Sequence, residues 1–223
     1  MGNLLVLEGL DGSGKSTQTE ALKQALLAEG VALKQIKLPD YDNPSSTLVK
    51  MYLNGDFGEN PNDVNAYAAS AFYAVDRFAS FQNGWKKDYD DGTLILADRY
   101  ATSNASYQMT KLPKENWKDY LTWLEDFEYG KLALPAPSLV IFFDMPIEVS
   151  QKLMTSRYEG DEQKKDVHEK DVAYLNHCRD AALFAAEQQG WVVISCAENG
   201  MPRSIEDIAA EVLKTVKEKL NLN

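Results

Sequence analysis

Five short apolar runs constrain the fold more strongly than any other feature of this 223-residue sequence. Several of them are continuously apolar, which is typical of strands that are covered on both faces. Because helical stretches separate the runs, the pattern predicts an α/β fold, in which helices flank both faces of a five-stranded, mostly parallel sheet. The predicted strands are residues 3–8, 31–38, 93–97, 138–143 and 191–195.

The segments between and after these runs are predicted to be helical. The sequence shows no internal repeat, low-complexity tract or linker, and we therefore expect one domain that covers residues 1–223. In sheets of this kind ligands bind beyond the carboxyl ends of the strands, so residues in that position are candidates for a site. The predicted helices are residues 15–29, 45–54, 63–88, 101–109, 114–129, 147–156, 167–189 and 204–219.

A glycine-rich loop follows the first predicted strand, where residues 7–18 read LEGLDGSGKSTQ. Gly9, Gly14, Lys15 and Ser16 have the spacing of a P-loop, whose backbone N–H groups and helix N-terminus hold phosphate oxygens. We expect Lys15 to reach the β- and γ-phosphates and the Ser16 hydroxyl to ligate Mg²⁺. A plain strand-to-helix turn with a hydroxyl cap is the alternative. The sequence therefore predicts a triphosphate-binding loop at residues 9–17, formed by Gly9, Gly12, Ser13, Gly14, Lys15, Ser16 and Thr17.

Asp11 places a carboxylate within this predicted anion-binding loop. A carboxylate that faced the phosphates would repel them, so we expect it to face a sugar hydroxyl, the Mg²⁺ shell or a second substrate. The alternative is a loop aspartate that turns into solvent, because aspartate is a common turn residue.

A second polar cluster follows the third predicted strand, where residues 94–108 read LILADRYATSNASYQ. Asp98 lies at the carboxyl end of that strand, where the acidic residue of P-loop sites lies near Mg²⁺. Arg99 comes next and can neutralise phosphate oxygens. The alternative for both residues is a weak surface ion pair at the start of a helix.

Composition and charge narrow the function classes. The net charge of −11 repels nucleic-acid phosphates, so we expect no nucleic-acid partner. No stretch approaches the ~18 consecutive apolar residues of a membrane span, and the first residues do not read as a leader peptide. The two cysteines make neither a disulfide framework nor a metal cluster, and we expect them to be buried in a reducing cytoplasm.

The runs VLEGLDGSGKSTQ and ADRYATSNASYQ together make the sequence resemble the thymidylate kinases. These are P-loop nucleoside monophosphate kinases that move the γ-phosphate of ATP to dTMP with Mg²⁺. The resemblance spans most of the chain and implies a cytoplasmic transferase of dTTP biosynthesis. Because members of the family are usually dimers that pair through helices beside the sheet, it also implies a homodimer.

The predicted helix at 63–88 contains the run AFYAVDRF. Its apolar positions recur at helical spacing, which predicts a single core-facing stripe. Tyr73 and Arg77 are neighbours at i and i+4 on the opposite face, and the resemblance implies that they stack on thymine and hydrogen-bond to it. An exposed Tyr–Arg pair is the alternative, and Phe72 is the alternative stacking residue. The apolar stripe comprises Val64, Tyr67, Ala68, Ala71, Phe72, Val75, Phe78 and Ala79.

Three residues after the Asp-Arg-Tyr run are implied to complete the dTMP pocket, although ordinary helix packing would also account for them. The amide of Asn104 can match a pyrimidine edge, since it offers both a donor and an acceptor. Ser103 lines the same pocket, and Tyr107 falls where the family places an aromatic ring against the sugar C2′. Apolar walls reject an added hydroxyl only about 10²-fold, so we expect a preference for deoxyribose without absolute exclusion.

The segment 37–46, KLPDYDNPSS, lies where many family members carry an arginine that approaches the acceptor phosphate. This sequence has none there, so we expect Arg99 to bind that phosphate with help from Lys37. Tyr41 or Asp40 would then serve the substrate or the waters of Mg²⁺. An ordinary Pro/Asp/Asn turn is the alternative.

The charged run RYEGDEQKKDVHEK, at 157–170, resembles the lid that closes over ATP in this family, which we place at about 155–170. Gly12 follows Asp11, so an arginine just after the loop aspartate is absent, and the lid must stabilise the transferring phosphoryl group. Arg157, Lys164 and Lys165 are its candidate cations, and a solvated charged loop is the alternative. The predicted catalytic residues are thus Asp11, Lys15, Arg99, Arg157 and Lys165.

Two other functions remain open on the sequence. A deoxynucleoside kinase, or a kinase of dUMP or another pyrimidine nucleotide, would use the same scaffold. A nucleotide-binding regulatory protein is less favoured, because a switch commonly carries a guanine-reading Asn-Lys-x-Asp and the sequence has no such tetrapeptide. A panel of acceptors in an ADP-release assay separates these possibilities.

Overall fold

The computed structural model describes residues 2–58, 60, 62–157 and 171–222, with the side chains of Ser156 and Arg157 left aside. The chain divides into two compact units. The first unit comprises Met1–Val6 and Ala32–Ser138, and the second unit comprises Leu7–Val31 and Leu139–Asn223. Within the described residues, no helix is long and apolar enough to cross a membrane.

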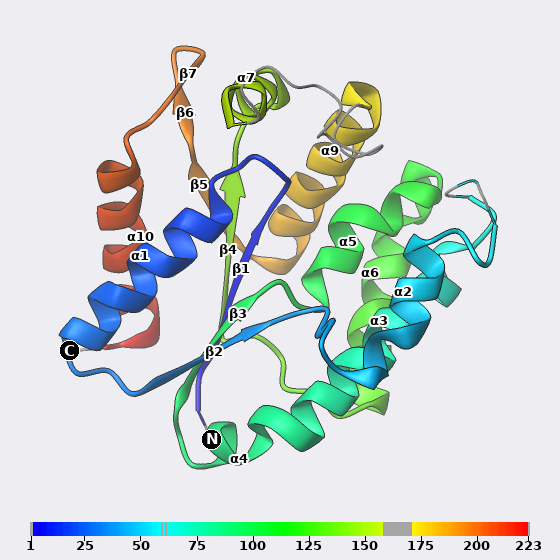
Figure 1. Cartoon of the computed structure of the whole chain (residues 1–223), viewed down its shortest axis with the longest axis horizontal. Helices are drawn as coiled ribbons and strands as arrows, with labels where there is room; N and C mark the ends of the chain where they lie inside the picture. Colours follow the sequence, from blue (N-terminus) through cyan, green and yellow to red (C-terminus); the bar gives the residue numbers. More distant parts are fainter. Residues whose placement is uncertain (1, 59, 61, 158–170, 223) are drawn as a thin grey trace. The chain divides into compact units, whose positions relative to one another are not determined.

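The chain has the predicted α/β fold, with a five-stranded sheet in the order β2-β3-β1-β4-β5 (Figure 1). The pairs β2–β3 and β4–β5 are both parallel, and Lys37 lies opposite Asp98 in the first of them. All five predicted strands are confirmed, with ends that differ by at most two residues. The strands are β1 (Leu4–Gly9), β2 (Leu33–Lys37), β3 (Leu94–Asp98), β4 (Leu139–Asp144) and β5 (Val192–Ser195).

Burial separates the central strands from the edge strands. Every residue of β1 and β3 is buried, and so are the residues of β4 up to its last. The edge strands β2 and β5 each bury only one residue, Ile36 and Ile194. Continuous apolarity therefore marks the strands covered on both faces, and the edges carry the more mixed pattern.

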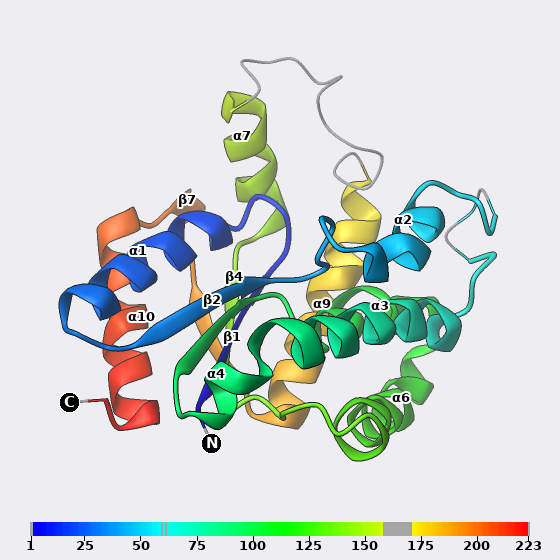
Figure 2. The ribbon, with the colours of Figure 1, turned by 60° about the horizontal axis from the view of Figure 1, so that its bottom comes forward.

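The helices of the first unit are shorter than predicted. The α3 helix starts at Ala66 because Asn65 caps it, its side chain accepting a hydrogen bond from the N–H of Ala68 (2.9 Å). The predicted helices 63–88 and 114–129 are each interrupted by a π-helical turn, η2 (Phe81–Trp85) and η5 (Asp126–Lys131). The α2 and α3 helices lie side by side (Figure 2). The α-helices of this unit are α2 (Thr47–Leu53), α3 (Ala66–Ser80), α4 (Lys86–Asp90), α5 (Thr102–Tyr107) and α6 (Trp117–Glu125).

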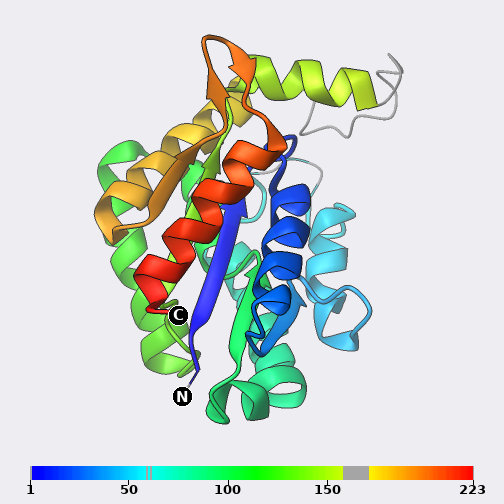
Figure 3. The same ribbon diagram turned by 90° about the vertical axis from the view of Figure 1, so that its left-hand side faces the viewer.

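The described helices of the second unit are α1 (Lys15–Ala28), α7 (Ile147–Arg157), α9 (Val172–Gln189) and α10 (Ile205–Leu220). The α1 and α10 helices pack together, as Figure 3 shows, and the Gln18 side chain donates to the carbonyl of Ile205 (3.1 Å). The ion pair Lys217–Glu29, at 2.7 Å, joins the same two elements at their other ends. Residues 167–170 of the predicted helix 167–189 lie outside the described residues.

A hairpin that the sequence reading missed, β6 (Ala197–Glu198) and β7 (Met201–Pro202), precedes α10. Its turn is Asn199-Gly200, and both residues have positive φ. Asn-Gly is the preferred pair for such a turn, so this dipeptide was the signal that would have identified the hairpin.

The buried face of α3 differs from the predicted apolar stripe. Tyr67, Val75 and Phe78 are 40%, 50% and 39% exposed, so the expectation that they face the core is wrong for the single chain. Its buried residues are instead small or polar: Ala66, Ala69, Ser70, Ala74, Asp76, Arg77 and Ser80. The helix thus buries the side that carries Arg77 and leaves apolar side chains at its surface.

The two cysteines are free thiols and both are fully buried, as the sequence predicted. Cys178 lies on α9 and Cys196 follows β5. Burial raises the pKa of each thiol to about 12, with smaller contributions from nearby carboxylates.

We expect the free energy of unfolding to fall as the pH rises above about 9. An unfolded thiol ionises near its ordinary pKa of about 8.5–9, whereas the folded thiols stay neutral until about pH 12, so the folded state binds more protons in this window. Each thiol then contributes at most ~1.4 kcal/mol per pH unit. Urea unfolding at pH 8, 9 and 10 measures the slope.

Lys111 opposes this effect, because burial lowers the pKa of its amine to about 8. Its contribution to stability rises between about pH 8 and 10.5, where the unfolded state binds the additional proton, and partial exposure reduces its size. The variant Cys178→Ala/Cys196→Ala should therefore lose the downward slope between pH 8 and 10. An unchanged slope in that variant would show that the thiols are not its source.

Candidate active site

The loop between β1 and α1 has the conformation of an anion cradle. Gly12 and Gly14 have φ of 78° and 83°, a left-handed conformation that favours glycine. Gly14 is the N-cap of α1, and no side chain among the described residues caps the helix. Since the first turn also lacks acidic residues, its backbone N–H groups and the positive end of the helix are left to bind an anion.

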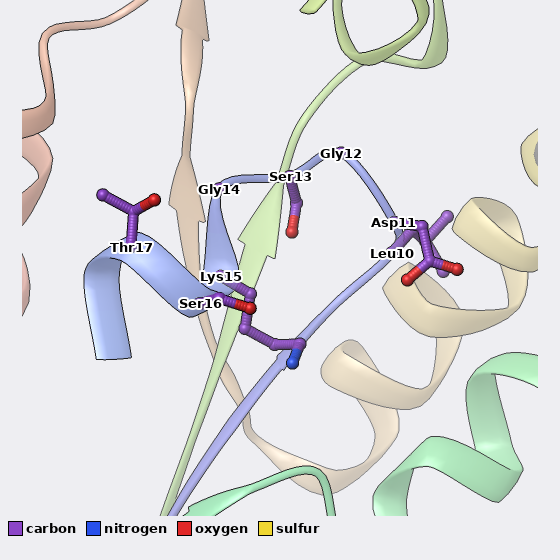
Figure 4. Close-up of a pocket in the computed structure, with 8 residues that line it drawn as sticks. All are labelled: Leu10, Asp11, Gly12, Ser13, Gly14, Lys15, Ser16 and Thr17. Atoms are coloured by element: carbon purple, nitrogen blue, oxygen red, sulfur yellow. The ribbon is translucent and has the colours of Figure 1, made fainter. Parts of the chain in front are cut away.

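Leu10–Thr17 line a hollow of about 120 Å³ (Figure 4). The Lys15 side chain runs back beneath the loop and is 8% exposed. The Ser13 hydroxyl points into the same space and has no hydrogen-bond partner within the described part of the chain. A Cβ at Gly9 would lie only 2.6 Å from Ser13 Oγ, so this serine position requires glycine at residue 9. Ser16 and Thr17 are exposed at the first turn of α1.

The Asp11 carboxylate points away from Lys15 and from the hollow, toward the side of α9 (Figure 4). In agreement with this orientation, its charge contributes to the raised pKa of Cys178 on α9. The carboxylate therefore does not face the space where the loop amides converge, which removes the electrostatic conflict raised by its place in the sequence.

In the first unit, the ends of β2 and β3 lie side by side. The N–H of Leu38 donates to the carbonyl of Asp98 (3.1 Å), and the Leu38–Pro39 peptide bond is cis. Asp98 is 5% exposed. Arg99 has φ of 71°, a costly conformation for a residue with a side chain, and strain of this kind clusters at functional sites. Its guanidinium lies over the Tyr107 ring, 5.2 Å from the centroid.

Asp76 anchors the loop that follows β2, a role that the sequence reading missed. Its two carboxylate oxygens accept hydrogen bonds from the Asp40 N–H (2.9 Å) and the Ser45 hydroxyl (2.6 Å). Asp76 is 1% exposed, and it precedes Arg77 on α3. The only trace of Asp76 in the sequence was its charge, on the polar side of the predicted helix that the structure buries. In the same loop region Lys37 and Tyr41 are exposed.

Tyr73 is half-buried among polar and aromatic groups of the first unit. Its ring makes an edge contact with that of Tyr52, at 6.3 Å between centroids. Burial is the main cause of its raised pKa; Tyr52 and Tyr41 add to the shift, and Arg99 and Arg77 oppose it. The structure therefore brings Tyr73 near three predicted site residues, Tyr41, Arg77 and Arg99.

Arg77 is buried in an ion pair with Glu128 of η5, which the sequence reading did not identify. Nε and Nη2 of Arg77 donate to the two carboxylate oxygens of Glu128, at 3.0 and 2.8 Å. The guanidinium lies 5.3 Å from the centroid of the Tyr100 ring. Burial disfavours the charge of Arg77, but the attraction of Glu128 outweighs it and the pKa of Arg77 is raised. Arg77 is thus buried and Tyr73 is half-buried, whereas the alternative required both side chains to be exposed.

Asn104 is buried, and its Nδ2 has no hydrogen-bond partner within the described residues. Its backbone carbonyl accepts a hydrogen bond from Tyr120 (3.4 Å), whose hydroxyl lies 2.6 Å from that of Ser70. Ser103 and Tyr107, on the same helix α5, are half-buried. A buried amide donor without an acceptor is costly, which indicates that a ligand supplies the acceptor.

The predicted site residues are divided between the two units. The second unit carries the glycine loop with Asp11, and the first unit carries the cluster after β2 and β3 with the polar side of α3. Arg157 is the last residue of α7, and Lys164, Lys165 and the rest of the predicted lid from 158 to 170 lie outside the described residues. The predicted site residues that lie in the first unit are Tyr41, Tyr73, Arg77, Asp98, Arg99, Ser103, Asn104 and Tyr107.

The oxygen donors present suit Mg²⁺. Within the described ranges, no group of three or more His, Cys, Asp or Glu is placed to hold a metal ion. Mg²⁺ prefers oxygen ligands and is commonly bound by one or two protein groups together with substrate phosphates. The exposed hydroxyl of Ser16, beside the phosphate cradle, and the carboxylate of Asp98, at the end of β3, are donors of this type.

Comparison with known proteins identifies one family. A family model described as thymidylate kinase matches residues 7–208. The chain is 28% identical over 192 residues to the thymidylate kinase of Mycobacterium tuberculosis, covering 84% of this chain and 87% of that protein. It is 27% identical over 223 residues to a probable thymidylate kinase of Thermococcus gammatolerans, covering 99% and 98%. It is 29% identical over 151 residues to the thymidylate kinase of Homo sapiens, covering 68% and 65%.

Proposed function

The chain belongs to the thymidylate kinase family, and we propose that it transfers the γ-phosphate of ATP to dTMP, which gives dTDP and ADP. This assignment rests on two groups of hydrogen-bond donors for which the described residues supply no side-chain cap or acceptor. They are the backbone N–H groups at the start of α1, beside the glycine loop, and the buried side-chain amide of Asn104. The first suits a polyphosphate, and the second suits a base edge. We propose that both units belong to one kinase domain that covers residues 1–223.

On the donor side, the residues of the glycine loop hold the phosphates of ATP. The backbone N–H groups around Gly14 bind phosphate oxygens, and the Lys15 ammonium neutralises charge on the β- and γ-phosphates. Mg²⁺, bound with the nucleotide, supplies further neutralisation of that charge. Ser16 and Asp98 would hold it. Asp11, which points away from the hollow, would act toward the acceptor nucleotide.

On the acceptor side, the polar surface of the first unit binds dTMP. Tyr73 stacks on the base, while Arg77 and Asn104 hydrogen-bond to its edge. Arg99 binds the 5′-phosphate, and its strained backbone is consistent with a functional position. Tyr41 and Ser103 complete the contacts. In the second unit, Arg157 and Lys165 of the lid would stabilise the transferring phosphoryl group.

The test is a coupled ADP-release assay with dTMP, dUMP, dCMP and thymidine as acceptors. We expect saturation by dTMP at the highest kcat/KM. Saturation by thymidine but not by dTMP would identify a nucleoside kinase. An affinity for guanine nucleotides far above that for ATP, without phosphoryl transfer, would favour a regulatory protein.

Tyr107→Ala is expected to narrow the preference for dTMP over ribo-TMP. The ring walls the sugar pocket, and a wall of this kind discriminates about 10²-fold against an added hydroxyl. The ratio of kcat/KM for the two acceptors measures the effect. Tyr107→Phe, which keeps the ring, is the control and should retain the preference. An unaltered ratio in Tyr107→Ala would show that the sugar is recognised elsewhere.

We further propose that the enzyme is a homodimer in the cytoplasm. The buried free thiols suit a reducing compartment, and the exposed residues Tyr67, Val75 and Phe78 on α3 suit a self-complementary helix contact. Val75→Glu should convert the dimer to a monomer, because it places a charge on the apolar contact.

Light scattering after size-exclusion chromatography measures the mass of both proteins. Ile205→Glu is a matched control, since Ile205 is also an exposed apolar residue but lies on α10. A wild-type protein that is monomeric at micromolar concentration would contradict the dimer.

A further inference from the structure

Glu128 is fully buried, and its carboxylate pairs with the Arg77 guanidinium. It lies on the π-helical turn η5, directly after α6, and π-helical turns are frequent at functional sites. Its carboxylate reaches Arg77 on α3, 51 residues away in sequence. Buried ion pairs rarely stabilise a fold better than apolar residues would, so a stability role alone does not explain this one.

The geometry of the pair fixes the orientation of the guanidinium. Two parallel N–H···O contacts, from Nε and Nη2, engage both oxygens of Glu128, and the Tyr100 ring covers the guanidinium. Glu128 thus engages Nε and Nη2, and Nη1 is the remaining nitrogen of the guanidinium. Because arginine has donors only, the group that meets Nη1 must be an acceptor.

The segment that carries Glu128 also supports Asn104. Tyr120 lies on α6, beside α3 in Figure 2, and its hydroxyl contacts both Ser70 and the backbone carbonyl of Asn104. Asn104 Nδ2 is a buried donor that has no acceptor within the described residues. One continuous segment, α6 with η5, thus contacts the two residues that present these donors.

We propose that Glu128 is a positioning residue, which holds Arg77 so that Nη1 selects a base with a carbonyl group at that edge over a base with an amino group. This inference rests on the proposed function, since it concerns the acceptor site of the same reaction. Thymine and uracil carry a carbonyl at position 4, where cytosine carries an amino group. The donor of cytosine would face the donor of Arg77, and neither would be satisfied.

Glu128→Gln tests the proposal, because it keeps the shape of the side chain while removing its charge and one of its two acceptors. We expect the dissociation constant of dTMP, measured by calorimetry without ATP, to rise about 10- to 100-fold, the value of one hydrogen bond to a charged group. The affinity for dCMP should change little. The preference for dTMP over dCMP should therefore fall at least tenfold, both in binding and in kcat/KM.

A double-mutant cycle separates positioning from a general loss of structure. If Glu128 acts through Arg77, the variant Arg77→Met/Glu128→Gln binds dTMP no more weakly than Arg77→Met alone. Glu128→Asp, which keeps the charge on a shorter side chain, should retain an intermediate preference and serves if Glu128→Gln does not fold. Asp126→Asn is the matched control on η5, where an exposed carboxylate pairs with Lys131, and it should leave the preference unchanged.

An unchanged ratio of dTMP to dCMP in a folded Glu128 variant would overturn the proposal. The proposal would also be overturned if the losses of dTMP affinity from the two substitutions multiplied in the double variant. Glu128 would then affect dTMP binding independently of Arg77. The wild-type protein reports separately on the proposed function. If it binds dTMP selectively but transfers no phosphoryl group, the kinase assignment fails while the positioning role stands.

Discussion

Lys15→Ala is expected to lower the turnover number about 10²- to 10³-fold while leaving the affinity for dTMP largely intact. Lys15 is a buried cation beneath the glycine loop, where a positive charge is held in place before the reaction begins. Charge develops on the transferring group in the transition state, so loss of the ammonium affects the reaction more than the binding of the acceptor.

The measurement is kcat in the ADP-release assay, paired with calorimetric binding of dTMP. Lys23→Ala is the matched control, because Lys23 lies on the same helix and pairs with Glu20 at the surface, at 3.6 Å. It should have the wild-type turnover number. Unchanged turnover in Lys15→Ala would exclude the glycine loop from the chemistry.

Arg77→Met is expected to lower the free energy of unfolding by about 3–5 kcal/mol. The substitution leaves Glu128, which is 0% exposed, as a buried carboxylate without its cation. Arg77→Met/Glu128→Leu should recover most of that loss, because two apolar side chains of similar volume replace the pair without leaving a charge behind.

Urea unfolding, followed by tryptophan fluorescence, measures both variants. Lys131→Met is the comparison, since it breaks the exposed pair with Asp126 (3.3 Å) on the same turn and should cost at most about 1 kcal/mol. If the double variant were as unstable as Arg77→Met, the loss would come from packing and the charge of Glu128 would not be its cause.

Together these variants assign different roles to two buried cations. Lys15 would act on the chemical step, and its loss should appear in kcat. Arg77 would act on stability and on acceptor choice, and its loss should appear in unfolding and in the dissociation constant of dTMP. A single assay of activity would not distinguish the two.

Much of the fold followed from local patterns. The central strands were recognised because strands covered on both faces carry continuous apolar runs, such as residues 4–7 of β1 and 94–97 of β3. The glycine loop was recognised because residues 9–17 must be permissive and rich in donors to hold phosphates. The α10 helix was recognised through its periodicity, which places Ile208, Val212, Val216 and Leu220 on one buried face.

The helices of the first unit were predicted less well. Periodicity over residues 63–88 and 114–129 gave continuous helices, but π-helical turns interrupt both. Those turns contain Trp85 and Glu128, which are both buried; Trp85 contacts the Tyr100 ring and Glu128 pairs with Arg77, 51 residues away. A window of neighbouring residues carries no information about such partners, and so the interruptions could not be predicted.

The sequence by itself determined the α/β class, the place of the glycine loop and the family, because each depends on residues that are close together along the chain. Only the tertiary structure decided which side of α3 is buried, how Arg77 is held, and that Arg99 adopts a positive φ. A buried charge requires a partner, and the partner of Arg77 lies 51 residues away. Folding brings the two together, so contacts across that separation determine the geometry at which dTMP is proposed to bind.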